Sequence, residues 1–185
     1  MTRALVAILV ALAACGDDDG DRPARREGSE PSTESPPREP ASAPRIPAAV
    51  LDPYEAIRAA LAADRIAGVW EPAAQLERAA AAAADGAAEP QREHYRQLST
   101  AAARLRESPR EGEGAAEETR RAFGEVSRHL VALVRSDASL ASGLSAFECP
   151  MALGYRKWVQ RGGALSNPYM GTRMPSCGSA SDWSP

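Results

Sequence analysis

Aromatic side chains are scarce in this chain of 185 residues: they make up 5% of it, although 44% of the residues are hydrophobic. Much of the hydrophobic content is alanine, and β-branched residues are few. Alanine has the highest helix propensity of all residues, whereas sheets favour β-branched and aromatic side chains. The composition therefore predicts closely packed helices rather than a sheet.

An excess of positive charge is also lacking. Lysine and arginine number 22 against 25 aspartates and glutamates, so the formal net charge is −3, and losing Arg3 with a signal peptide makes it −4. A protein that binds phosphate backbones needs a basic face, so nucleic acid is excluded as a partner.

Motifs of catalysis are missing as well. The sequence contains no C-x-x-C pair, no nucleophile elbow and no phosphate-binding loop, and no histidine stands in a pattern with Cys149 or Cys177. We therefore expect no enzymatic activity. A thiol oxidoreductase built from these two cysteines is the least favoured alternative, since it requires a depressed thiol pKa.

The chain has no apolar run long enough to span a bilayer. Its longest run, Ala4–Ala14, follows Arg3 and ends in Leu12-Ala13-Ala14-Cys15, which matches a bacterial lipobox. Residues 1–14 are thus predicted to be a signal peptide. Cleavage leaves Cys15 carrying lipid, and Gly16 after it favours the outer membrane. We expect a lipid-anchored protein of the bacterial cell envelope, on the periplasmic side.

Large apolar side chains are nearly absent from the segment that follows Cys15. Residues 15–47 hold four aspartates and seven prolines, at positions 23, 31, 36, 37, 40, 44 and 47. Such a segment cannot bury enough surface to offset its conformational entropy, which predicts a disordered linker. The folded domain is then expected at 48–180, followed by a short tail at 181–185.

Apolar residues at helical spacing predict four helices in this domain. Their expected starts are Asp52-Pro53, Val69, Pro90 and the residue after Gly114, and their expected ends are Gly68, Asp85-Gly86, Ser108-Pro109 and Ser136. Short connections imply antiparallel neighbours, so the predicted fold is all-α: an up-and-down four-helix bundle. Beyond Ser136 the periodicity fades, and we expect an irregular, loop-rich segment packed on the bundle.

That last segment concentrates the sulfur of the chain. It contains Cys149 and Cys177 and three of the four methionines: Met151, Met170 and Met174. Soft sulfur donors suit a thiophilic ion, Cu(I) first, with Zn(II) and Ag(I) as lesser candidates.

Four short motifs in the same segment resemble a bacterial family of domains of unknown function. The motifs are Cys149–Ala152 (CPMA), Trp158–Gln160 (WVQ), Asn167–Gly171 (NPYMG) and Met174–Gly178 (MPSCG). That family occurs as small secreted proteins and attached to periplasmic adaptor subunits of copper and silver efflux pumps. The resemblance, which covers about residues 50–178, implies heavy-metal binding with Cys149, Met151, Met174 and Cys177 as ligands. It also implies an efflux adaptor as a partner.

Two interpretations of the cysteines stay open at this point. In an oxidising periplasm Cys149 and Cys177 are expected to form a disulfide, which makes the domain a helical interaction module without metal. When reduced, they are expected to bind Cu(I), with Met151 and Met174 as thioether ligands. A plain disulfide has no need of the methionines, although a methionine is also a common core filler.

Other candidate residues are weaker. Met170, His94 and His129 are possible further ligands, but a lone histidine on a helix is usually structural. Trp158 and Tyr169 are expected to form an apolar lid beside the sulfur residues. The charged run of Glu117, Glu118, Arg120 and Arg121 predicts a solvated helix face.

Overall fold

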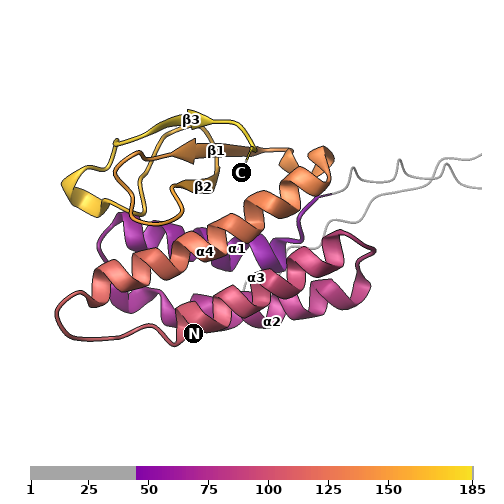
Figure 1. Cartoon of the computed structure of the whole chain (residues 1–185), viewed down its shortest axis with the longest axis horizontal. Coiled ribbons are helices and arrows are strands. Elements are labelled where there is room, and N and C mark those ends of the chain that lie inside the picture. Colours follow the sequence, from indigo (N-terminus) through magenta and orange to yellow (C-terminus); the bar gives the residue numbers. More distant parts are fainter. Residues whose placement is uncertain (1–44, 185) are drawn as a thin grey trace, which may run out of the picture. The chain divides into compact units, whose positions relative to one another are not determined.

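The computed structural model describes residues 45–184, which form four α-helices and a small sheet (Figure 1). The predicted signal peptide 1–14, the predicted lipidation site Cys15 and the predicted linker as far as residue 44 lie outside the described residues. None of the helices in the described part is long and apolar enough to cross a membrane.

The four predicted helices are all present. They are α1 (Ala48–Ala62), α2 (Trp70–Gly86), α3 (Gln91–Arg106) and α4 (Ala115–Ser136). The expected start of the first helix is wrong, because α1 begins four residues before Asp52 and contains Pro53. Proline lacks an N–H and therefore costs one hydrogen bond there, but its ring is buried in the core.

The core is built mainly from aliphatic residues of the helices, with a few aromatic rings on one side. The largest fully buried side chains include Tyr54, Ile57, Leu61, Leu76, Leu98, Leu105, Phe123, Leu130, Leu133 and Trp158. Full burial of one such apolar side chain contributes about 1.5–3 kcal/mol.

The all-α fold class is wrong, because the segment after α4 forms a sheet. Strands β1 (Leu144–Glu148), β2 (Lys157–Arg161) and β3 (Ser179–Ser181) pair in the order β2-β1-β3, and both pairs are antiparallel. The strands are short, and β3 has no large apolar side chain, so its sequence carries no alternating pattern. What defines β3 is its backbone pairing with β1, some thirty residues away in the chain.

The sheet lies on the opposite side of α1 and α4 from α2 and α3, so the described part has three layers (Figure 1). Tyr54 of α1 joins the layers, because its buried hydroxyl lies 2.9 Å from Ser127 Oγ of α4 and accepts the N–H of Val159 in β2 at 3.0 Å. Burial raises the pKa of Tyr54 well above its ordinary value. Strand β2 is thereby linked to both α1 and α4.

Candidate functional site

Strand pairing brings the two C-terminal cysteines together. Cys149 follows β1 directly and Cys177 lies two residues before β3. Since Glu148 pairs with Ser179, the next positions, 149 and 178, face each other at the same end of the ladder. The Sγ atoms of Cys149 and Cys177 are 3.1 Å apart, and both cysteines are free.

This close approach depends on Gly178. Its φ is +129°, and a Cβ built there would lie 2.7 Å from the Glu148 carbonyl oxygen and 3.2 Å from the Trp158 ring. A side chain at this position would push β3 away from the end of β1. The motif M-P-S-C-G therefore ends in glycine for a steric reason.

Each cysteine lies at one end of a tight turn that also contains a methionine: Cys149 begins the first turn and Cys177 ends the second. The N–H of Ala152 donates to the Cys149 carbonyl at 3.2 Å, and the N–H of Cys177 donates to the Met174 carbonyl at 3.1 Å. The N–H of Cys149 in turn donates to the carbonyl of Arg156 at 3.1 Å, which closes the loop between β1 and β2.

The side chain of Asn167 connects its own turn to the turn that ends at Cys177. Its side-chain oxygen accepts the N–H groups of Tyr169 (2.7 Å) and Met170 (3.1 Å), and its side-chain amide donates to the Cys177 carbonyl at 2.6 Å. These hydrogen bonds form the kind of turn that an asparagine before a proline favours. The sequence did not show that the same amide orients Cys177.

Aromatic rings form the floor beneath the cysteines. Trp158 stacks on Phe147 with centroids 5.5 Å apart and meets the edge of Tyr169 at 5.8 Å, and the Tyr169 hydroxyl donates to the Lys157 carbonyl at 2.6 Å. Trp158 and Tyr169 are both buried. They support the sulfur residues from inside rather than covering them as a lid.

The two thiols differ in exposure: Cys149 is fully buried and Cys177 is partly exposed. The hydrogen bond with Cys149, together with partial burial, raises the pKa of Cys177. A raised pKa leaves less nucleophilic thiolate at neutral pH, which disfavours thiol–disulfide exchange catalysis. A metal ion binding here has to displace protons.

The methionines lie at the surface around this pair. The side chains of Met151 and Met174 are 55% and 39% exposed. Met151 and the partly buried Met170 line one cavity of about 420 Å³ beside the Cys149 turn. The structure thus brings the cysteines into contact and leaves the thioethers of the predicted ligand set, Met151 and Met174, exposed at the surface.

The histidines belong to another part of the molecule. His129 lies in a shallow cavity lined only by α3 and α4, where burial lowers its pKa. His94 is on α3, and its buried Nδ1 has no hydrogen-bond partner among the described residues. Within residues 45–184, no three His, Cys, Asp or Glu side chains are grouped as metal ligands.

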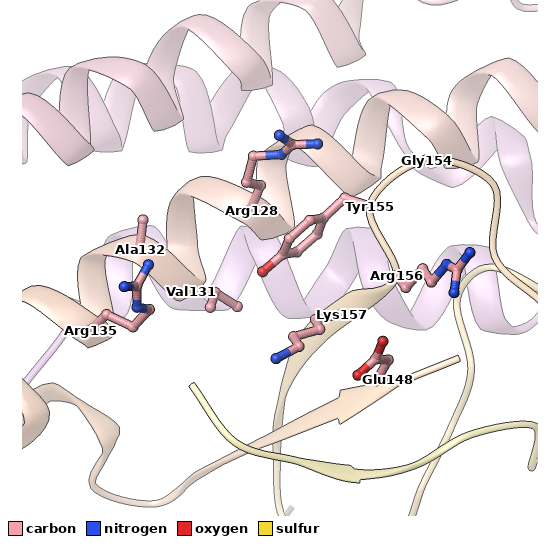
Figure 2. A pocket seen from close by; sticks show the side chains of 9 residues that line it. All are labelled: Arg128, Val131, Ala132, Arg135, Glu148, Gly154, Tyr155, Arg156 and Lys157. Atoms are coloured by element: carbon pink, nitrogen blue, oxygen red, sulfur yellow. The ribbon is translucent and has the colours of Figure 1, made fainter. Parts of the chain in front are cut away.

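Another cavity, of about 340 Å³, lies between α4 and the start of β2 (Figure 2). Arg128, Arg135 and Arg156 stand at separate edges of it and point away from one another, while the ring of Tyr155 projects between them. The guanidinium of Arg128 lies 5.1 Å from the centre of that ring. These arginines do not converge on one point.

The prediction of a solvated helix face is wrong for Arg120. Its side chain is only 13% exposed and donates to the carbonyls of Pro168 (3.1 Å) and Leu61 (3.2 Å), and it pairs with Asp64. It therefore clamps the 167–173 loop to α1 and α4. Its neighbour Arg121 does form the expected surface pair, with Glu117 at 3.0 Å.

Comparison of the chain with protein-family models, with curated proteins and with solved structures found no match.

Proposed function

We propose that this domain binds a thiophilic metal ion, Cu(I) first, through Cys149 and Cys177. The proposal is carried by one observation: two free thiols from separate loops lie 3.1 Å apart at the end of a paired strand ladder. Thiolates are the donors that Cu(I) prefers, with Zn(II) and Ag(I) as further candidates.

The geometry of the pair suits coordination with little movement. Metal–sulfur bonds of about 2.3 Å at a tetrahedral angle separate the two sulfurs by about 3.8 Å. Starting from 3.1 Å, the thiols need to part by less than about 1 Å. Cys177 is the partly exposed member, so we expect its turn to adjust and the ion to enter from its side.

Met151 and Met174 are proposed as supplementary thioether ligands. Both are exposed and each shares a turn with one cysteine. Methionine is unbranched with three rotatable bonds, so either side chain can swing toward an ion held by the thiolates. Met170 is a further candidate because it lines the same cavity as Met151.

The cellular setting is proposed from the N-terminal signals and the family resemblance. A signal peptide ending at Cys15 and a proline-rich linker favour a lipid-anchored protein on the periplasmic side of the envelope, with the outer membrane preferred. In that setting the domain would buffer copper or pass it to an efflux adaptor, without catalysing a reaction.

A second candidate function follows from the same contact. Oxidation of the two thiols to a disulfide would join residues that are 28 positions apart in the sequence. The domain would then be a disulfide-stabilised interaction module without metal. The complete burial of Cys149 favours this form, because a reductant has little access to the buried sulfur once the disulfide has formed. One molecule cannot be in both states at once.

An anaerobic Cu(I) titration with a competing chelator tests the first candidate. The full chain carrying Cys15→Ser, fully reduced, is expected to bind one Cu(I) per molecule. The Cys149→Ser/Cys177→Ser variant should bind about 100-fold more weakly, since only thioethers remain. Equal affinity of the two proteins would refute the proposal.

Free-thiol counting on protein isolated from the periplasm separates the two candidates. Two free thiols with bound copper support the metal site. No free thiol and no metal supports the disulfide-stabilised module.

A further inference from the structure

The cavity of about 420 Å³ beside the Cys149 turn has walls from three separate segments. The first turns of α4 contribute Arg120 and Arg121, the loop after β1 contributes Met151 and Leu153, and the short helix η3 (Gly171–Arg173) contributes Arg173. A volume of this size lies in the range of cavities that hold small molecules.

Its apolar wall is unusually exposed. Met151 and Leu153 are 55% and 56% exposed, and together with Met174 they are the exposed large hydrophobic side chains of the described part. Two of these three therefore meet in one cavity. Exposed apolar side chains gathered in a concave site indicate binding of an apolar group.

The rim of the cavity is cationic although the whole chain has a net charge of −3. Three arginines line it against one carboxylate, that of Glu117, which pairs with Arg121. Arg120 pairs with Asp64, which lies outside the lining, so Arg173 is the arginine of the rim whose charge is not paired in the described part of the chain. Arg173 has no ion pair or side-chain hydrogen bond within residues 45–184. Guanidinium groups bind carboxylates and phosphates through paired N–H bonds, so the rim is suited to an anionic group.

The arginines are also positioned for this role. Arg120 is oriented by the carbonyls of Leu61 and Pro168, and the side-chain stem of Arg121 runs 3.6 Å from the Cβ position of Gly154. The cationic wall and the apolar wall thus face the same space from α4 and from the loop after β1.

We propose that this cavity binds one small amphipathic anion, a molecule with a single anionic head group on an apolar chain. The head group contacts Arg173 and Arg121, and the chain lies against Leu153 and Met151. The proposal does not depend on metal binding by Cys149 and Cys177.

Decanoate is a suitable probe, titrated into the full chain carrying Cys15→Ser at concentrations below micelle formation. We expect saturable binding of one decanoate per chain. Decanol and decyltrimethylammonium, which keep the chain but lack the negative charge, should bind about tenfold more weakly, because the charge-assisted hydrogen bonds are lost.

Matched substitutions locate the site. Arg173→Gln and Leu153→Ser should each weaken decanoate binding about fivefold or more, since each removes one type of contact. Arg135→Gln, in the cavity of Figure 2, and Met174→Ser, exposed but outside the proposed site, should leave it unchanged.

Three results would overturn the proposal: no saturable binding of decanoate, equal binding of decanol, or loss of binding in the control variants equal to that in the site variants. Binding to phosphatidylglycerol vesicles without binding of free decanoate would also overturn it, because the exposed residues of the cavity would then form a membrane-contact surface.

Discussion

Asp64 joins three segments of the chain through one side chain. It follows α1 with a φ of +55°, a left-handed conformation that aspartate and asparagine tolerate better than most residues. Its carboxylate accepts the N–H of Thr172 at 2.8 Å and the Thr172 hydroxyl, and it pairs with Arg120. The loop that carries Asn167 and Cys177 is thereby tied to the end of α1.

The pKa of Asp64 is lowered, chiefly by the hydrogen bonds from Thr172 and then by the charge of Arg120. A carboxylate with a lowered folded-state pKa stabilises the fold above its unfolded pKa of about 3.9 and loses that contribution as the pH falls through the folded value. We expect Asp64→Asn to lower the free energy of unfolding at pH 7 by about 1 kcal/mol, because a side chain that is 40% exposed is screened by solvent.

Urea unfolding at several pH values checks this expectation. Asparagine retains the backbone conformation and an accepting oxygen, so the variant isolates the charge. The difference between the variant and the parent should shrink as the pH falls through the lowered pKa of Asp64, because the parent carboxylate is then protonated as well. Asp85→Asn, which removes an exposed carboxylate at the end of α2, serves as the control.

Helix α4 meets the loop before β2 at a glycine. A Cβ at Gly124 would lie 3.2 Å from the carbonyl oxygen of Tyr155, which is closer than most Cβ contacts. The next residue, Arg156, accepts the N–H of Cys149. A side chain at 124 therefore presses on the backbone that positions the first cysteine.

We expect Gly124→Val to destabilise the protein by about 2 kcal/mol, because an overpacked contact between helix and loop has to be relieved by backbone shifts. Gly86→Val is the matched control, since no atom lies within 4 Å of a Cβ at Gly86. Urea midpoints of both variants check the prediction. Similar midpoints would show that α4 does not hold this loop tightly.

The cysteine pair lies where the end of β1 meets the start of β3, so a bond between the two sulfurs would close the entire segment between these strands into a loop. If the pair is oxidised, closing a loop of 28 residues stabilises the fold by about 3–4 kcal/mol in the chain-entropy model. The thermal midpoint of the oxidised protein should then exceed that of the reduced protein by about 10 °C.

Calorimetry with and without reductant checks this prediction, with Cys149→Ser/Cys177→Ser as the control. The control should be insensitive to reductant. The prediction would be contradicted if the thermal midpoint of the parent protein, oxidised until no free thiol remains, did not change on addition of reductant. The disulfide would then contribute nothing to stability. Cu(I) should raise the midpoint of the reduced parent alone, because binding to the native state stabilises it.

The positions of α2, α3 and α4 were predictable because apolar residues recur at helical spacing, as at Phe123, Val126 and Leu130. The start of α1 was not, since packing of Val50 and Leu51 in the core extends the helix before Asp52. The strands were missed because residues such as Ser179–Ser181 have no apolar pattern. Among the candidate ligands, Cys149 and Cys177 stood out by chemistry, whereas Asn167 and Gly178 matter through contacts that only the fold creates.

Features that depend on local chemistry can be inferred from the order of residues: the four helices, the soft-sulfur segment and the turn at Asn167. Features that depend on pairing between distant residues appear only in the folded protein. The three-stranded sheet, the clamp of Arg120 on the 167–173 loop and the 3.1 Å approach of the two thiols all join segments far apart in the chain. Backbone hydrogen bonding and steric fit set those contacts, and neither leaves a periodic trace in the order of residues.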